Sequence, residues 1–451
     1  MITRRSRLAL LVVPALALAT ACTGGSSGGS ATPAASGDQT LKIGLMTQLS
    51  GPSKAAGVEA QNGARLAVDV INGLNPSIQL PLASDAGLPN LGGAKVSLVV
   101  KDVTPGAVDP KENEAEAKKG VDEVQKAAGE AVTDLVSNQG VNALIGAYDP
   151  EVTEAASQRA ERFEVPFINA DSPATFLTDA GRDWFFRIGP TWRQAGQAFF
   201  SLPGVDPKIK IDKIAVLYAQ DKAGQDVVTS TTELAKEGGL DQPNKVATFG
   251  FKPDGSDAAA AYARVRAYNP DTLLLYSSPA SVQPLLQAVA TSGWKPKAAM
   301  SFSLGYVTAQ TFDPAAAAVD GLMRSTSWSI EAAQRNPAAQ AVTGLYQRRF
   351  NSQMTEAAAS AFTAVMTAAQ AVNNAGTVDE QRVRSALLSL NIPGEQTIMP
   401  WAGIQFDETH QNTLAQPLIE QYHNRAFSII YPSDAAANGA KPIYPAPNAA
   451  G

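Results

Sequence analysis

Polar and aromatic residues follow several short apolar segments of this chain, at the point where each apolar segment ends. Five of them lie before residue 190 and five after it: Tyr148, Asp149, Ala170, Asp171 and Ser172, and Gln220, Asp221, Ser277, Ser303 and Tyr306. Most of these side chains carry carboxylates, hydroxyls, amides or aromatic rings, which can bind a small polar ligand through hydrogen bonds and charge. Asp and Ser are also ordinary turn and helix-capping residues, so a purely structural role is the alternative for each of them.

The apolar segments before these residues alternate with longer, Ala-rich helical patterns. In the first half of the chain we expect strands at 41–46, 95–101, 143–145 and 165–168, and helices at 58–72, 110–136 and 151–163. In a second block, which begins at residue 213, we expect strands at 213–218, 246–251, 272–276 and 298–302, and helices at 224–236, 258–267 and 281–292. This alternation predicts an α/β fold with two parallel sheets, each flanked by helices. Ligands of such sheets bind outside the carboxyl ends of the strands, which is where the ten residues lie.

The composition argues against several other classes of function. The formal net charge is −6 and 17% of the residues are charged, whereas a nucleic-acid partner needs a concentrated basic surface. The two histidines, His410 and His423, fall in segments expected at the surface, so neither a transition-metal site nor a Ser-His-Asp hydrolase is predicted. No glycine-rich phosphate loop follows a strand. We therefore expect a protein that is not an enzyme, with no cofactor and no catalytic residue.

The first 21 residues have the three parts of an export signal, and residue 22 is the only cysteine of the chain. Basic residues precede an apolar run at 8–19, which is too short to span a bilayer as a helix. The small residues before Cys22 resemble a lipobox, after which bacterial lipoproteins are acylated on cysteine. We therefore expect an exported protein, lipid-anchored at Cys22 on the outer face of the bacterial cytoplasmic membrane through a flexible tether at 22–40. Secretion without an anchor, and export by the twin-arginine route, are the alternatives.

An ordered series of short segments resembles the type I periplasmic binding proteins of the leucine/isoleucine/valine-binding kind. The series runs from about residue 41 to 432 and includes LKIGL at 41–45, LSGP at 49–52, NGARLA at 62–67, VPFIN at 165–169, KIAVL at 213–217 and GIQFD at 403–407. The resemblance implies two Rossmann-like lobes joined by three crossovers. It also implies that the lobes close over a small ligand, which is delivered to the membrane subunits of an ABC permease.

Two departures from the family pattern bear on the identity of the ligand. In amino-acid-binding members, the segment after the third strand supplies small hydroxyl residues for the ligand carboxylate, and here that segment contains Tyr148 and Asp149. The acidic residue that takes the ligand ammonium in those members aligns with Ser303, which is neutral. The resemblance therefore implies the fold and the transport role, but it does not decide whether the ligand is an amino acid.

Alignment to the family divides the chain into two lobes. The first lobe is expected at 41–190 plus 327–395 and the second at 191–326 plus 396–432, followed by a loosely ordered tail at 433–451. Trp192, at the first crossover, is a further candidate for ligand binding, with core packing as its alternative. These features predict a monomeric solute-binding lipoprotein of an ABC importer, with a ligand-sensing surface receptor of the same fold as the alternative.

The acidic residues of the strand ends predict the charge of the ligand. Asp149 and Asp171 have no Lys or Arg in their own segments, and an unpaired carboxylate in a cleft is unfavourable. We therefore expect a small polar ligand such as an amino acid, an amide or a related amine-bearing compound. Asp171 is expected to matter more than Asp149, which precedes Pro150 and can simply cap the following helix.

Overall fold

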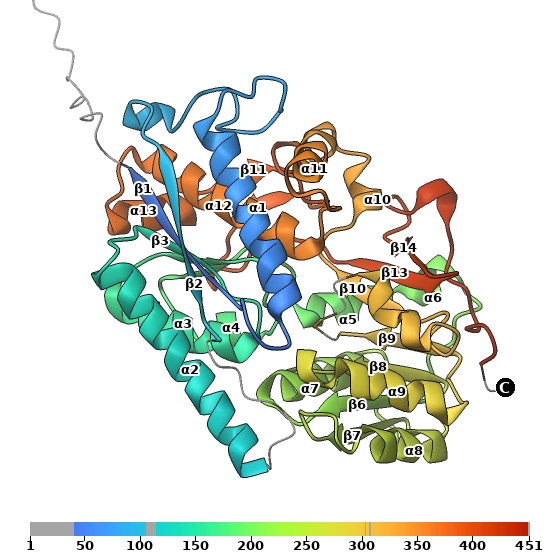
Figure 1. Cartoon of the computed structure of the whole chain (residues 1–451). Helices are drawn as coiled ribbons and strands as arrows, with labels where there is room; N and C mark the ends of the chain where they lie inside the picture. Colours follow the sequence, from blue (N-terminus) through green and yellow to red (C-terminus); the bar gives the residue numbers. More distant parts are fainter. Residues whose placement is uncertain (1–39, 105–113, 303, 306–307, 450–451) are drawn as a thin grey trace, which may run out of the picture. The chain divides into compact units, whose positions relative to one another are not determined.

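A computed structural model of the chain describes residues 40–104, 114–302, 304–305 and 308–449 (Figure 1). The predicted export signal, tether and lipidated Cys22 lie outside these ranges. None of the helices within them combines the length and apolarity that a membrane crossing requires.

Five parallel strands form the first sheet, in the order β2-β1-β3-β4-β5. The strands are β1 (Leu41–Thr47), β2 (Val96–Asp102), β3 (Ala143–Gly146), β4 (Phe167–Asn169) and β5 (Phe185–Arg187). Side chains of β1 alternate between two apolar layers: Ile43 and Leu45 pack in one core, and Met46 packs in the other. The sheet is therefore covered on both faces, as its nearly continuous apolar strands require.

Helices from two distant parts of the chain cover one face of the first sheet. These are α1 (Lys54–Asn72) and α12 (Glu356–Ala375), which lie side by side in Figure 1 and pack closely. A β-carbon at Gly63 of α1 would overlap the carbonyl oxygen of Ala358 in α12, so the close approach of the two helices depends on glycine. The helices α2 (Glu114–Ser137) and α3 (Pro150–Phe163) pack against each other and contribute to the other core.

The second sheet has seven strands, in the order β14-β13-β10-β9-β8-β6-β7. The strands are β6 (Ile214–Ala219), β7 (Val246–Phe251), β8 (Thr272–Tyr276), β9 (Ala298–Ser301), β10 (Met323–Thr326), β13 (Leu418–His423) and β14 (Ala426–Tyr431). The pairs from β7 to β10 are parallel, whereas β13 pairs antiparallel with both β10 and β14. The sheet is therefore parallel, as predicted, except for a C-terminal hairpin at one edge.

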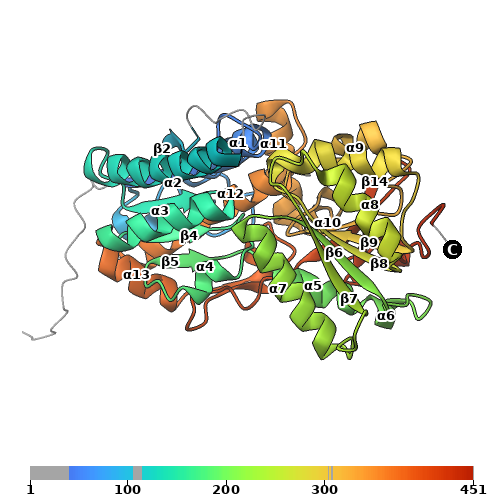
Figure 2. The ribbon, with the colours of Figure 1, turned by 90° about the horizontal axis from the view of Figure 1, so that it is seen from below.

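Helices also cover the second sheet. Figure 2 shows α8 (Ala258–Tyr268) beside α9 (Val282–Ser292), while α5 (Trp192–Phe200) packs against α7 (Lys222–Glu237). The remaining helices are short or lie around the crossovers: α4 (Phe176–Asp179), α6 (Leu202–Val205), α10 (Ile330–Ala333), α11 (Pro337–Phe350) and α13 (Glu380–Leu388). Five 3₁₀ turns complete the elements: η1 (Pro89–Leu91), η2 (Pro279–Ser281), η3 (Ala309–Ala315), η4 (Gly394–Gln396) and η5 (Ala437–Gly439).

The chain passes between the two sheets three times: after β5, after β10 and before β13. This confirms the predicted number of crossovers.

The third passage is tied to the end of the first sheet by Arg187, which is 1% exposed. Its guanidinium donates to Gln411 Oε1 at 2.6 Å, to Thr178 Oγ1 at 2.7 Å and to the carbonyl oxygen of Ala174. Burial lowers the pKa of Arg187 to about 10. Arg187 therefore joins the third passage to the first sheet.

Packing around the third passage differs from the lobe division expected from the sequence. A small antiparallel pair, β11 (Asn391–Pro393) and β12 (Gly403–Gln405), lies between α13 and the third passage. Ile398, Trp401 and Ile404 belong to the same apolar cluster as β1 and α12. The segment from about 396 to 415 therefore packs with the first sheet, and we propose a lobe boundary near Pro417 instead of residue 395.

The segment after β14 is held by contacts with distant parts of the chain. The side chain of Gln421 donates to the carbonyl oxygen of Ile443 at 3.1 Å and accepts from its amide at 2.7 Å. The amide of Ala446 donates to the carbonyl oxygen of Lys297 at 2.8 Å. These contacts differ from the loose ordering expected from composition, because composition does not reveal partners that are distant in sequence.

Candidate ligand-binding cleft

A cavity of about 800 Å³, including its open mouth, lies between the two sheets where their strands end. Its walls come from both sides and from the crossovers: Ala56, Tyr148, Ala170, Asp171, Pro173, Pro190, Thr191, Trp192, Ala195, Phe302, Leu304, Arg324, Ser325, Thr326, Ser327, Thr355, Glu356, Ala357 and Pro417. Tyr148 and Asp171 follow β3 and β4, whereas Phe302 and Ser327 follow β9 and β10. The cavity therefore occupies the position that parallel sheets usually offer to ligands.

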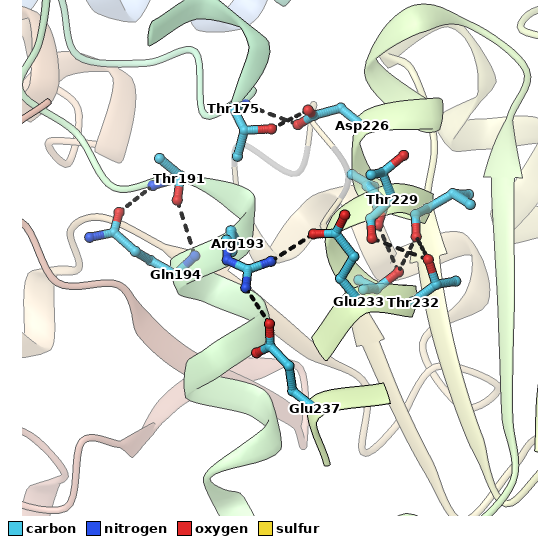
Figure 3. Close-up of polar contacts among 12 residues, drawn as sticks. Thr175, Thr191, Arg193, Gln194, Asp226, Thr229, Thr232, Glu233 and Glu237 are labelled. Atoms are coloured by element: carbon cyan, nitrogen blue, oxygen red, sulfur yellow. Dashed lines mark hydrogen bonds and ion pairs between the residues drawn. The ribbon is translucent and has the colours of Figure 1, made fainter. Parts of the chain in front are cut away.

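Trp192 is fixed in the wall by the start of α5. Thr191 caps this helix: its Oγ1 accepts the Gln194 amide at 3.0 Å, and the Gln194 side chain accepts the Thr191 amide at 2.7 Å (Figure 3). The indole of Trp192 donates to the carbonyl oxygen of Phe302 at 3.1 Å and packs edge-on against Tyr276, with ring centroids 5.2 Å apart. This arrangement gives the cavity a rigid aromatic wall.

Tyr148 links the two sides of the cavity. Its hydroxyl accepts a hydrogen bond of 2.8 Å from the amide of Gly305, in the loop after β9. Burial raises the pKa of the Tyr148 phenol well above its ordinary value, so the hydroxyl stays neutral. Because Tyr148 follows a strand of the first sheet and Gly305 a strand of the second, this bond stabilises the closed arrangement of the cleft.

Two carboxyl groups face the cavity from different elements. Asp171 lies in the loop after β4. Burial raises the pKa of its carboxyl group to about 8, and the nearby charge of Glu356 adds to the rise. Glu356 lies in the first turn of α12, and its Oε1 accepts the amide of Ser327 at 2.5 Å and the Ser327 hydroxyl at 2.8 Å. The cavity is therefore acidic on the side formed by β4 and α12.

Arg324 also lines the cavity, from β10. Its Nε and Nη2 atoms donate to Glu420 Oε2 at 2.9 and 2.8 Å, and its guanidinium stacks over the ring of Phe427 at 3.8 Å from the centroid. Burial raises the pKa of Glu420, and the charge of Arg324 opposes that rise. The positive charge of Arg324 is therefore balanced by Glu420 within the protein itself.

The structure separates the residues predicted from the sequence into three groups. The first group lines the cavity and consists of Tyr148, Ala170, Asp171 and Trp192. The second group lies outside its lining and consists of Asp149, Ser172, Gln220, Asp221 and Ser277. The third group, Ser303 and Tyr306, falls outside the described residues.

Residues of the second group have structural contacts elsewhere in the chain instead. Asp149 accepts the hydroxyl of Ser53, before α1, at 3.1 and 3.2 Å, and Asp221 caps α7 by accepting the amide of Gly224 at 2.7 Å. Ser172 and Ser277 are buried, and the Ser172 amide donates to Asn169 at 3.0 Å. The exposed side chain of Gln220 lies against Gly250 of the neighbouring strand. A position after a strand was therefore not sufficient to place these residues in the cavity lining.

Several cavity residues were not predicted, and Glu356 and Arg324 are the charged ones. Thr355 followed by Glu356 before an Ala-rich run has the pattern of a helix start, which gives no indication of a ligand. Arg324 lies within a short strand and not after one. The tertiary fold brings these two residues to the cavity that Asp171 lines: Arg324 lies in β10, before the second crossover, and Glu356 lies in α12, after it.

The surface position expected for His410 is wrong. His410 is 6% exposed, stacks on the ring of Phe186 with centroids 4.5 Å apart, and has a pKa lowered by burial. It packs at the third crossover, outside the cavity lining. In the part of the chain that the structure describes, no group of His, Cys, Asp and Glu residues is arranged to hold a metal ion.

A second set of contacts joins the two sides next to the cavity. Glu151 in the first turn of α3 accepts the amide of Ala223 in the first turn of α7 at 3.0 Å, and Lys222 pairs with Glu154 at 2.5 Å. Asp226 of α7 accepts the amide of Thr175 at 2.9 Å (Figure 3). These contacts form a latch, consisting of α3, the segment 171–175 and the first turns of α7.

Acidic residues gather at the latch and beside it, where Asp149 precedes α3 and Asp221 precedes α7. Burial raises the pKa of Asp149 to about 7 and that of Asp221 to about 8, and in both cases the charge of Glu151 adds to the rise. The pKa of Glu151 is raised by burial, while its bonds to backbone amides act in the opposite direction. Carboxyl groups from both sheets are therefore brought together when the two sides meet.

Comparison with known proteins places this architecture in a family. The family described as periplasmic binding protein matches residues 122–419. A curated relative, Leu/Ile/Val-binding protein homolog 8 of Brucella abortus (strain 2308), is 24% identical over 406 residues, which cover 88% of this chain and 91% of the relative.

Solved structures share the fold at low sequence identity. The branched-chain amino acid transporter substrate-binding protein LivJ from Streptococcus pneumoniae, in complex with isoleucine, has a TM-score of 0.64 and 19% identity, covering 86% of this chain and 98% of LivJ. A solute-binding protein of an ABC transporter from R. palustris, in complex with benzoate, has a TM-score of 0.65 and 16% identity, covering 87% and 96% of the two chains. The chain belongs to the periplasmic binding protein family and is similar to its leucine/isoleucine/valine-binding members.

Proposed function

We propose that this protein is the solute-binding component of an ABC importer, and that it captures a small, amine-bearing polar ligand for delivery to a permease. The observation that carries the proposal is the cavity between the two sheets, which combines an aromatic wall at Trp192 with carboxyl groups at Asp171 and Glu356. A cavity of this kind suits ligand binding without catalysis. Its walls come from two parts of the protein that can close around a ligand and contact it with both charged and aromatic side chains.

The charge of the lining supports an amine-bearing ligand. Arg324 is paired with Glu420, so the carboxyl groups of Asp171 and Glu356 set the charge that the lining offers to a ligand. Asp171, whose pKa is raised to about 8, is largely protonated near neutral pH and ionises when a cation binds beside it. A ligand cation stabilises such carboxylates, whereas a simple anion would be repelled by them. Tyr148, Ala170, Asp171 and Trp192 are the sequence-predicted residues that we propose as ligand contacts.

A ligand screen by thermal denaturation tests the proposal. A compound present at ~100 times its dissociation constant stabilises the folded protein by roughly 2.7 kcal/mol, which is a measurable rise in Tm. We expect amino acids or related amines to raise Tm, and Trp192→Ala to abolish the rise because the indole forms one wall. A screen in which no small solute raises Tm, confirmed by calorimetry, would contradict the proposed role.

We further propose that the protein is anchored by lipid on Cys22, on the basis of the export signal and the glycine- and serine-rich segment that follows it. Cys22→Ser is expected to move the protein from the membrane fraction to the soluble or secreted fraction. Ser27→Ala, in the same tether, is the matched control and is expected to stay with the membrane. Equal membrane retention of both variants would refute the anchor and leave the binding role untouched.

A further inference from the structure

We propose that the cleft recognises a protonated amine through a pair of carboxyl groups, and that Glu356 of α12 is the residue that sets this specificity. The inference rests on the proposed solute-binding function and deepens it. Neither the strand-end pattern nor the comparisons assign a role to Glu356, which comes from the second crossover.

Glu356 is held in a defined position in the wall. Thr355 caps α12, with its Oγ1 accepting the amide of Ala358 at 3.4 Å, so Glu356 is the first residue of the helix. Within the part of the chain that the structure describes, the Ser327 amide and hydroxyl both donate to the same carboxylate oxygen of Glu356, Oε1. The oxygen Oε2 is therefore the one that a ligand can meet.

Asp171 faces the same side of α12. Glu356 and Ser360 are four residues apart, which places them on one face of the helix. Asp171 and Glu356 both line the cavity, and the charge of Glu356 contributes to the raised pKa of Asp171. The two carboxyl groups therefore lie near each other in one recess, although they come from distant parts of the sequence.

The charged groups that face this recess come from three elements. The loop after β4 supplies Asp171 and α12 supplies Glu356, while β10 supplies Arg324, whose charge is matched by Glu420 on β13. The Tyr148 phenol on the remaining side is neutral. A recess with an excess of carboxylates is most stable when a ligand brings a positive charge into it.

The oxygen atoms of the recess also require hydrogen-bond donors. Ionised carboxylates accept hydrogen bonds and cannot donate them, so a ligand nitrogen that carries N–H groups satisfies both charge and hydrogen bonding. A protonated amine meets both needs. A neutral amide or urea supplies donors without charge, and a carboxylate supplies neither.

Calorimetry with a defined set of probes tests the inference: L-leucine and putrescine as amine-bearing compounds, and acetamide, urea and benzoate as compounds without a protonated amine. We expect binding of at least one amine-bearing probe and of none of the others. Glu356→Gln is expected to weaken the binding tenfold or more, because an amide keeps the shape but loses the charge. Glu380→Gln is the matched control, since Glu380 is also a first-turn glutamate, in α13, outside the cavity.

Asp171→Asn provides a second variant if Glu356→Gln unfolds, which circular dichroism and Tm would reveal. Unchanged affinity in either folded variant would overturn the inference. Binding of urea, acetamide or benzoate by the wild type, without binding of an amine, would also overturn it while the solute-binding function stands. Failure of all five probes to bind would count against both the inference and the amine-binding function.

Discussion

Replacing Asp171 with asparagine keeps the shape of the side chain and removes its ionisation. In the unfolded chain the carboxyl has an ordinary pKa of 3.8, whereas burial beside Glu356 raises the pKa in the folded protein to about 8. The folded protein therefore holds this proton more tightly than the unfolded chain does. It follows that Asp171 lowers stability progressively as pH rises from ~4 to ~8, whereas the uncharged amide of the Asp171→Asn variant does not.

The size of the effect can be bounded from the two pKa values. The rise in pKa from 3.8 to about 8 means that ionising Asp171 costs ~6 kcal/mol more free energy in the folded protein than in the unfolded chain, at ~1.4 kcal/mol per pKa unit. Opening of the cleft hydrates Asp171 and limits the loss, so we expect ~2 kcal/mol in the folded ensemble. Asp149 and Asp221 also have raised pKa values, but they titrate equally in both proteins and cancel in the comparison.

Thermal denaturation of ligand-free wild type and Asp171→Asn at pH ~5 and pH ~8 measures this difference. Since ~1 kcal/mol corresponds to roughly 2 °C for a large domain, the variant should gain roughly 4 °C in Tm over the wild type between the two pH values. Asp241→Asn, at an exposed position outside the cavity, is the control and should show no such gain. An equal Tm difference at both pH values would refute the burial of an uncompensated carboxyl at position 171.

Three further predictions address the fold and the latch. Arg187→Met should lower the free energy of unfolding by ~3–5 kcal/mol in urea denaturation, because it removes a buried guanidinium that bonds to Gln411, Thr178 and the carbonyl oxygen of Ala174; a loss below ~1 kcal/mol would contradict this. Gly63→Ala should lower the same free energy by ~1–3 kcal/mol through the clash between α1 and α12, whereas Gly204→Ala, where a β-carbon meets open space, should not; equal effects would show that the helices can separate freely. Glu151→Ala should weaken ligand binding several-fold in calorimetry without contacting the ligand, because it removes the bond that joins α3 to α7; unchanged affinity would show that this contact does not stabilise the closed cleft.

The sequence predicted the elements well where a strand is a continuous apolar segment. The strands expected at 246–251 and 272–276 have those bounds in the structure, and the helix expected to begin at 224 begins two residues earlier, at Lys222. Local patterns are sufficient here because the alternation of burial and the turns between elements are encoded within a few residues. The antiparallel hairpin of β13 and β14 was not predicted as part of the second sheet, since strand pairing is decided by residues distant in sequence.

The same division applies to the cleft. Position after a strand was enough to bring Tyr148, Ala170 and Asp171 to the cavity, because parallel strands of one sheet end at the same edge. It was not enough for Asp149 or Asp221, whose side chains turn to nearby helix starts and backbone amides. Side-chain direction in a turn depends on the neighbours that tertiary packing supplies.

The sequence by itself determined the alternation of strands and helices, and it predicted that a ligand binds where the strands of the two sheets end. Only the tertiary structure placed Glu356 beside Asp171 and paired Arg324 with Glu420, because the crossovers bring these residues together from segments that are far apart in the chain. The net charge of a cavity is a sum over such distant residues, and each one contributes only after packing has brought it to the wall and removed it from water.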